Sequence, residues 1–278
     1  MMRLVWQLVA VAAVAFVGGQ GVMAADGKPW LTLAIGIATA VLSVFVYRWV
    51  VRLTERRAVT ELAWKGAGTS TVLGTLIGIG LFASVIVNIY FLEFYEVNGL
   101  GSVMGAVGLF GFMAAAAVTE EVMYRGVLFR IVEERIGTWI ALVLTGVLFG
   151  LVHMLNPNAT LWGAIAIVIG AGGMLPAAYV ATRSLWLPIG LHFGWNLAAS
   201  AIFSTEVSGN GTPQGLLDTT MSGPLLITGG GFGPEASLYS VVFCVITTAV
   251  LMWIAYRRGY VVPFRRADRA AATTKLPQ

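Results

Sequence analysis

Hydrophobic residues dominate eight stretches of the chain, and short polar segments separate them. The apolar runs cover roughly residues 4–24, 30–50, 70–92, 101–118, 138–155, 161–182, 186–204 and 237–256. A helix of about 20 residues crosses the ~30 Å hydrocarbon core of a bilayer, because each residue adds about 1.5 Å. The pattern therefore predicts an all-α fold, a polytopic bundle of about eight transmembrane helices.

Positive charge falls in every second polar segment. Basic residues follow the second run (RWVVRLTERRAVTELAWK), the fourth (VEERIG), the sixth (ATRS) and the last (YRRGYVVPFRRADRA), whereas LEFYEVNG, LNPNAT and the segment from Glu206 to Glu235 lack them. Cytoplasmic loops carry an excess of Lys and Arg, so both termini are expected in the cytoplasm. The first run could instead be a signal peptide, because VMA before ADG resembles a cleavage site, but its length favours an uncleaved helix.

Composition supports the membrane assignment. The chain is 58% hydrophobic and 11% charged, with a mean hydropathy of +0.84, whereas soluble domains carry about 25% charged residues. The basic residues that give the net charge of +4 lie mostly in the loops. The chain has no basic stripe interleaved with aromatic residues, so its sequence does not indicate nucleic-acid binding. The single Cys244 lies in an apolar run and is expected to be a packing residue. Glycine pairs four apart (Gly74/Gly78, Gly101/Gly105, Gly146/Gly150 and Gly190/Gly194) predict close helix packing.

A few ionisable side chains, and one asparagine, fall within the apolar runs or just beyond their ends, where a charged residue at membrane depth costs roughly 2.5–3.5 kcal/mol on insertion scales. They are Glu120, Glu121, Arg125, His153, His192 and Asn196. Residues of this kind usually face the interior of a bundle or a wet cavity. We therefore expect a functional polar cavity, although the Glu121–Arg125 pair alone could be structural and each histidine alone could be a packing residue.

The spacing of these residues predicts which of them meet. Glu121 and Arg125 are four apart, as are His192 and Asn196, so each pair shares a helix face. Adjacent Glu120 projects about 100° from Glu121 and is expected to face the cavity.

The depth of the two histidines differs in this reading. Glu120 and His153 are equidistant from the turn expected at Ile136–Gly137 and should each stand about 24 Å from it. His192 would lie at another depth unless the chain breaks at Asn156–Pro157 or at Gly170–Pro176.

A carboxylate and an imidazole in a confined cavity suit general acid–base catalysis. A water between Glu120 and His153 could attack a carbonyl, with His192 and Asn196 stabilising the oxyanion. Zinc held by Glu120, His153 and His192 is an alternative. Neither histidine begins an HExxH motif, no aspartate lies in an apolar run, and no nucleophile motif surrounds Ser200 or Ser204. A non-catalytic immunity or scaffold protein and a proton-coupled transporter stay open, although no internal repeat supports a transporter.

Three motifs carry a family resemblance. EEVMYR fits EExxxR, FGLVH fits FxxxH and HFGWN fits HxxxN, in that order on apolar helices. They resemble the motifs of the CPBP family of intramembrane proteases, also called Abi, which includes the CAAX prenyl endopeptidases. SLWLPIGLHFGWN closely resembles the last family motif with its lead-in. The resemblance covers roughly residues 100–200, while the first three helices and the last are unspecific.

The resemblance implies an intramembrane endopeptidase. It implies that Glu120 activates water with His153, that His192 and Asn196 stabilise the tetrahedral intermediate, and that Glu121 and Arg125 form an organising pair. Family members are often labelled metalloproteases, yet a metal-free glutamate mechanism is also argued, so the cofactor is either none or zinc. Eukaryotic members remove three residues after a prenylated cysteine, many prokaryotic members have no known substrate, and some are linked to bacteriocin self-immunity.

The expected organisation follows from these patterns. The expected partners are the bilayer and a peptide or lipidated protein substrate. The protein is expected in the cell membrane, with its active cavity facing the cytoplasm. The sequence does not indicate the oligomeric state. The segments are 1–98, about three helices with a basic cytoplasmic loop; 99–205, the catalytic core; 206–236, an extracytoplasmic loop rich in Gly, Ser and Thr; 237–257, the last helix; and 258–278, a basic cytoplasmic tail expected to be disordered.

Overall fold

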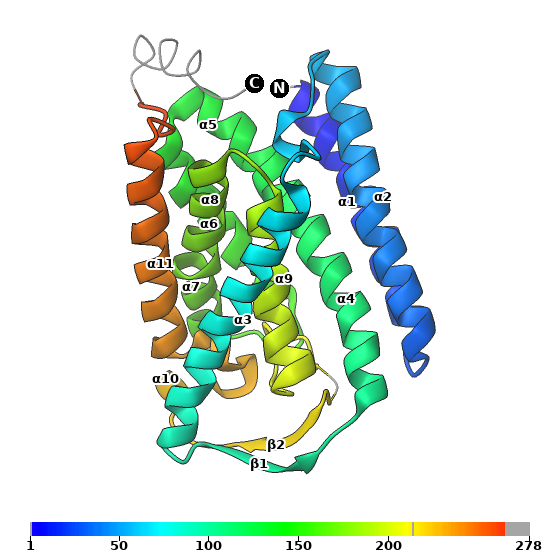
Figure 1. The fold of residues 1–278 in the computed structure, drawn as a ribbon, viewed down its shortest axis with the longest axis vertical. Coiled ribbons are helices and arrows are strands. Elements are labelled where there is room, and N and C mark those ends of the chain that lie inside the picture. Colours follow the sequence, from blue (N-terminus) through cyan, green and yellow to red (C-terminus); the bar gives the residue numbers. More distant parts are fainter. Residues whose placement is uncertain (1, 213, 265–278) are drawn as a thin grey trace.

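The chain folds into a bundle of helices with a small two-stranded sheet at one end (Figure 1). The computed structural model describes residues 2–212 and 214–264. The long helices are α1 (Met2–Ala24), α2 (Pro29–Glu55), α3 (Ala67–Phe91), α4 (Val103–Glu121), α6 (Thr138–Val152), α7 (Leu161–Ile169), α8 (Ala171–Thr182), α9 (Trp186–Leu197) and α11 (Leu238–Arg257). The short elements are α5 (Arg130–Ile136), α10 (Leu225–Thr228), β1 (Tyr95–Leu100) and β2 (Leu217–Met221), with π-helical Val122–Phe129 and Ala198–Ile202.

Seven helical segments in the described part of the chain are long and apolar enough to cross a bilayer, and the protein is an integral membrane protein. They correspond to the first six predicted runs and the last. The predicted run 186–204 is also helical, but the 12-residue α9 continues into a 5-residue π-helical segment and is the shortest of the set. The fourth run was predicted to end at residue 118, whereas the observed helix continues unbroken from Val103 to Ile136.

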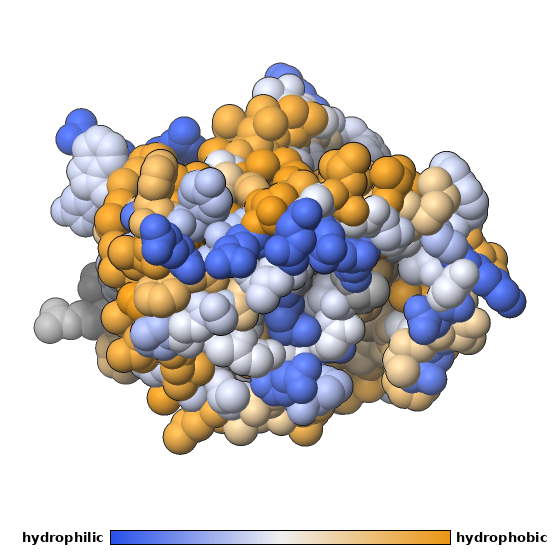
Figure 2. Space-filling model, turned by 90° about the horizontal axis from the view of Figure 1, so that it is seen from below, coloured by the Kyte–Doolittle hydropathy of each residue, from blue (hydrophilic) through white to orange (hydrophobic). Residues whose placement is uncertain are grey.

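The two ends of the bundle differ in chemistry. We call the end where α1 begins and α11 finishes the termini end, and the opposite end, with β1 and β2, the sheet end (Figure 1). The predicted basic segments, as far as residue 264, lie at the termini end. Seen from the sheet end, hydrophilic residues gather across the middle and hydrophobic residues surround them (Figure 2). Large apolar side chains such as Phe16, Phe45 and Trp253 are exposed on the helices, as expected for contact with lipid.

The sheet joins two segments that the sequence predicted as loops on the same side of the membrane. Strand β1 pairs antiparallel with β2, with Tyr95 opposite Met221 and a bulge between Val97 and Gly99. The sequence did not predict the strands, but it did predict that the two segments lie at the same end of the bundle. Each strand gains backbone hydrogen bonds that neither could form alone.

Glycines bring α3 against α9. A Cβ added at Gly74 would lie 2.4 Å from the Leu187 carbonyl oxygen, and one at Gly194 would lie 2.1 Å from the Thr75 carbonyl oxygen. A Cβ added at Gly146 would likewise lie 3.0 Å from the carbonyl oxygen of Gly172 on α8. These close backbone approaches confirm the predicted packing role, except that Gly101 and Gly105 pack on the 214–217 segment instead of on a helix.

The centre of the bundle is the segment formed by α7 and α8. In the most apolar 18-residue stretch of Leu161–Thr182, 78% of the residues are buried within the protein, compared with 17–39% in the other candidate spans. Gly170 interrupts the two helices with a ψ of −90°. This interruption falls in the stretch where the sequence predicted a break.

Charged side chains at the termini end form a buried network that the sequence did not predict. Arg130 donates to both carboxylate oxygens of Glu55, and Arg57 donates to both oxygens of Glu61. Tyr47 donates to Glu61 and to the Gly126 carbonyl oxygen. The network ties α2 and the loop after it to the helix that carries the predicted site.

The C-terminal tail is anchored where it leaves α11. The backbone of Val262 exchanges hydrogen bonds with the Thr138 amide and hydroxyl groups, and Arg183 donates to the Tyr260 carbonyl. Residues 258–264 therefore have an ordered packing, contrary to the prediction. Residues 265–278, the rest of the predicted disordered tail, lie outside the described residues.

Candidate active site

Glu121 and Arg125, one helical turn apart, form the predicted ion pair. Arg125 Nη1 donates to Glu121 Oε1 over 2.8 Å, and both side chains are almost fully buried. Arg125 Nη2 also donates to the Ala171 carbonyl oxygen, and the guanidinium lies over the Phe149 ring, 4.5 Å from its centre. The pair is therefore locked between α4, α6 and α8, which confirms the predicted contact.

The helix changes its winding immediately after this pair. Residues Val122–Phe129 are π-helical, and such segments occur often at functional sites. The carbonyl oxygen of Gly126 accepts from Tyr47 and from Arg130, and Gly126 packs directly against the Tyr47 ring. Packing from α2 thus supports the wider turn beside Glu121.

His192 comes to the same level as the two glutamates. Its Nδ1 lies 2.9 Å from Glu121 Oε1, and its Nε2 lies 3.9 Å from Glu120 Oε2. The long helix extends past the start of α9 at the termini end, so a residue in the second turn of α9 can meet Glu121 (Figure 1). This arrangement, together with the break at Gly170, removes the depth difference expected from the sequence.

Glu120 projects away from the buried pair, as predicted from the 100° step. Its side chain is 30% exposed, compared with 0% for Glu121. Glu120 Oε2 is nevertheless shielded from solvent and has no hydrogen-bond partner, and the same is true of Glu121 Oε2. A shielded carboxylate oxygen with no donor is costly, so both oxygens are ready acceptors for a water or a substrate group.

His153 lies at the end of α6 and contacts its own helix. Its Nδ1 is 2.7 Å from the Phe149 carbonyl oxygen, and its ring packs edge-on against the Phe149 ring. A carbonyl only accepts, so Nδ1 carries the proton and Nε2 is the acceptor of the neutral ring. The hydrogen bonds of the described residues do not join His153 to Glu120; the recorded contact of Glu120 is with His192.

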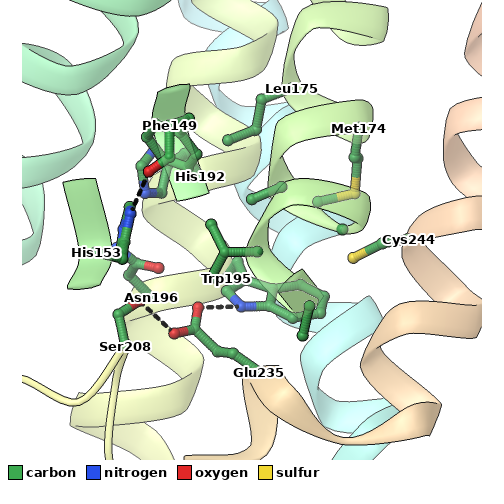
Figure 3. A pocket seen from close by; sticks show the side chains of 14 residues that line it. Phe149, His153, Met174, Leu175, His192, Trp195, Asn196, Ser208, Glu235 and Cys244 are labelled. Carbon is green, nitrogen blue, oxygen red and sulfur yellow. Dashed lines mark hydrogen bonds between the residues drawn. The ribbon is translucent and has the colours of Figure 1, made fainter. Parts of the chain in front are cut away.

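A cavity of about 30 Å³ connects the predicted residues on α6 and α9 (Figure 3). That volume holds about two water molecules. His153, His192 and Asn196 line it together with Ser208 and Glu235, and the other side is apolar, with Met174, Leu175 and Cys244. Glu120 does not line the cavity, but its carboxylate lies 3.9 Å from Nε2 of His192, which does. His192 is thus the residue shared by the charged cluster and the cavity.

Two residues of the site have roles that sequence reasoning missed. Phe149 packs against both His153 and His192 and supports the Arg125 guanidinium, whereas the motif analysis gave it no role beyond its position in FxxxH. Glu235 comes from the segment predicted as an outer loop, and its carboxylate is buried at the cavity. The sequence around Glu235 carries no signal of this burial, because the segment is rich in Gly and Pro and shows no hydrophobic periodicity.

The residues do not form a ready metal site. Among residues 2–212 and 214–264, no three His, Cys, Asp or Glu side chains come close enough together to hold a metal ion. His153 Nδ1 and His192 Nδ1 are engaged by a carbonyl and by a carboxylate, so Nε2 is the nitrogen that each ring offers to a ligand. The described residues do not gather Glu120, His153 and His192 into a three-ligand set, and the zinc alternative stays a prediction.

Part of the chain matches a known family. Residues 101–198 match the model of Rce1-like proteins, described as type II CAAX prenyl endopeptidase Rce1-like. This stretch contains all six predicted site residues and ends before Ser208 and Glu235. The comparisons with curated proteins and with solved structures found no match to this chain.

Proposed function

The match of residues 101–198 assigns this chain to the CPBP/CAAX protease family, and from that premise we propose that it is an intramembrane endopeptidase in which Glu120 activates a water molecule. The observation that carries the proposal is the shielded, unpartnered Oε2 of Glu120 beside His192. Arg125, Glu121 and His192 form a chain of contacts that fixes the imidazole next to this oxygen.

The proposed reaction begins with proton transfer from water to Glu120. The oxygen of that water attacks the carbonyl carbon of the scissile peptide bond, and the carbonyl oxygen becomes an oxyanion. His153, whose Nε2 is free to accept, orients the water through its second proton. Glu120 then gives its proton to the leaving nitrogen, the carbon–nitrogen bond breaks, and a carboxylic acid and an amine result.

Two side chains of α9 are proposed to stabilise the oxyanion. The amide of Asn196 lines the cavity one helical turn from His192. Protonated His192 donates from Nε2, because its Nδ1 already faces Glu121. Such donors, held in place before the reaction, are worth about 10²–10³-fold in rate each.

We further propose a prenylated peptide as substrate, in the cell membrane with the cavity reached from the cytoplasm. The matched family of type II CAAX prenyl endopeptidases supports the substrate class. The excess of basic residues at the termini end supports a cytoplasmic position for that end. Burial of Ser208 and Glu235 at the sheet end of the cavity supports entry from elsewhere.

A cleavage assay on purified wild-type protein tests the function. The probe is a farnesylated peptide ending in cysteine and three further residues, and mass spectrometry identifies the products. We expect release of the terminal tripeptide, with a rate that changes less than about twofold when a strong chelator is present. Activity that is lost on chelation and restored by zinc would overturn the metal-free mechanism. Intact peptide after incubation with folded protein would instead favour the non-catalytic immunity or scaffold role.

A further inference from the structure

A buried carboxylate lies at the sheet end of the cavity, outside the stretch that matches the family. Glu235 Oε1 accepts a hydrogen bond from Trp195 Nε1 over 2.9 Å, and its Oε2 accepts one from the Ser208 hydroxyl over 2.5 Å (Figure 3). Glu235 is 7% exposed. The ion pairs recorded among residues 2–212 and 214–264 do not include it. Burying a carboxylate with neutral donors alone is costly, so its position calls for a specific role.

The segment that carries Glu235 is firmly attached to the bundle. Trp162 donates from its indole nitrogen to the Ala236 carbonyl oxygen, and the Ser240 hydroxyl donates to the Pro234 carbonyl oxygen. Phe232, three residues before Glu235, is fully buried against Gly163. The carboxylate therefore sits on a rigid support instead of a free loop.

Its partner Trp195 is the residue next to Asn196 on α9. The Trp195 ring packs edge-on against Phe82, with 5.2 Å between the ring centres, so the indole is held between this ring and the Glu235 carboxylate. Both Trp195 and Asn196 line the cavity. Any rotation of α9 that moves Asn196 must also move the Trp195 indole and break its hydrogen bond to Glu235.

The partner Ser208 closes the other side. Its carbonyl oxygen accepts a hydrogen bond from the side chain of Asn156, three residues after His153. The backbone of the neighbouring Gly209 is hydrogen-bonded to that of Asn158 and of Phe232. Glu235 is thus hydrogen-bonded to α9, which carries Asn196, and to Ser208, which is itself hydrogen-bonded to the loop after His153.

We propose that Glu235 is a positioning residue that fixes Asn196 through Trp195 and closes the sheet end of the cavity. This inference rests on the proposed function for its catalytic part. The proposed role depends on the two hydrogen bonds of Glu235 and not on its charge. Glu235→Gln can accept from the Trp195 indole and donate to Ser208, so it should keep Asn196 in place. Glu235→Ala can form neither hydrogen bond and should not.

The kinetic test compares these variants on the farnesylated peptide. Glu235→Ala should lower kcat about tenfold or more with KM within about threefold, because a displaced oxyanion donor affects the transition state. Glu235→Gln should stay within about threefold of wild type, and Trp195→Phe should match Glu235→Ala. The double variant of Glu235→Ala and Trp195→Phe should have a kcat no lower than either single variant, because both single changes remove the same Trp195–Glu235 hydrogen bond. Independent, multiplying effects would overturn the proposal.

A matched control lies on the same segment. Glu206 accepts hydrogen bonds from the backbone of Val207, Gly211 and Thr212 and stabilises the loop without lining the cavity. Glu206→Ala should therefore leave kcat within about twofold of wild type, as a surface change away from the site does. If it lowers kcat as much as Glu235→Ala, the effect is loosening of the loop, and the proposal fails.

A second readout does not depend on activity. Cys244 is the single cysteine of the chain, is buried, and lines the same cavity. Its reaction with a small cationic methanethiosulfonate reagent, followed by mass, reports whether water reaches the cavity. The rate should rise about tenfold or more in Glu235→Ala, but not in Glu206→Ala or Glu235→Gln, because opening the cavity admits solvent to a previously enclosed thiol.

The two readouts separate the two claims. If the wild type does not cleave the probe, the proposed function fails, and an unchanged labelling rate in Glu235→Ala then overturns the closing role of Glu235 as well. If the wild type cleaves and Glu235→Ala matches it in kcat, the inference alone fails. If Glu235→Ala does not elute as a folded species, Trp195→Phe, which leaves the carboxylate and Ser208 in place, decides the kinetic comparison.

Discussion

Replacing Arg125 by methionine should both destabilise the fold and abolish activity. The Arg125 side chain is 2% exposed and that of its partner Glu121 is 0% exposed, so the variant leaves a carboxylate without its cation inside the bundle. Removing one member of a buried ion pair costs about 3–5 kcal/mol. His192 still contacts Glu121 Oε1, which places the expected cost near the lower end, at about 3 kcal/mol.

Removing both charges should separate stability from activity. The double variant Glu121→Leu with Arg125→Met removes the carboxylate and the guanidinium together, and such replacements are often neutral or stabilising. We expect its free energy of unfolding to return to within about 1 kcal/mol of wild type. Activity should stay lost, because His192 Nδ1 no longer has the carboxylate that fixes it.

The measurements are equilibrium unfolding in detergent micelles and cleavage of the farnesylated peptide. Arg52→Met is the control, since Arg52 is exposed on α2 and should change stability by less than about 0.5 kcal/mol. A cost below about 1 kcal/mol for Arg125→Met would show that Glu121 does not depend on this cation. Wild-type cleavage by the double variant would show that the pair does not organise the site.

Further predictions concern the oxyanion donor, the packing of α9 and the buried charges at the termini end. Asn196→Ala should lower kcat about 10²–10³-fold with little change in KM, measured by the same cleavage assay; an unchanged kcat would remove Asn196 from the reaction. Gly194→Ala should lower both stability and activity, because its Cβ would lie 2.1 Å from a backbone carbonyl oxygen, whereas Gly80→Ala, with open space around it, should be neutral; equal effects would refute the packing argument. Burial raises the pKa of Glu61, but hydrogen bonding and charge from Arg57 outweigh it and hold the pKa below its usual value. A lowered pKa in the folded state stabilises the fold above the unfolded value of about 4.3, so a thermal melting point that does not fall as pH drops below about 4 would contradict this assignment.

The sequence predicted the features that depend on local spacing. Hydrophobic runs located the helices, except that the fourth helix continues to Ile136, well past the predicted end of its run. The four-residue step correctly placed Arg125 on Glu121, because that contact follows from helix periodicity alone. The glycine pairs on α3 and α9 were also correctly interpreted, because backbone approach between helices needs small residues.

Features that depend on contacts between distant segments were missed. The pairing of β1 with β2 joins segments more than a hundred residues apart, and no hairpin signal links them. The π-helical turn after Glu121 depends on Tyr47 from α2. Glu235 was assigned to a loop because nothing in its Gly- and Pro-rich surroundings shows that the segment folds back onto α9. Each of these required the tertiary structure.

The central claim is that Glu120, and not its neighbour, is the base that activates water. Its most direct test is the cleavage rate of Glu120→Gln, measured on protein that elutes and unfolds like wild type and still binds the farnesylated peptide. We expect a loss of about 10²–10⁴-fold in kcat, the range for removal of a general base, with binding unchanged. A kcat within about tenfold of wild type would contradict the proposed mechanism.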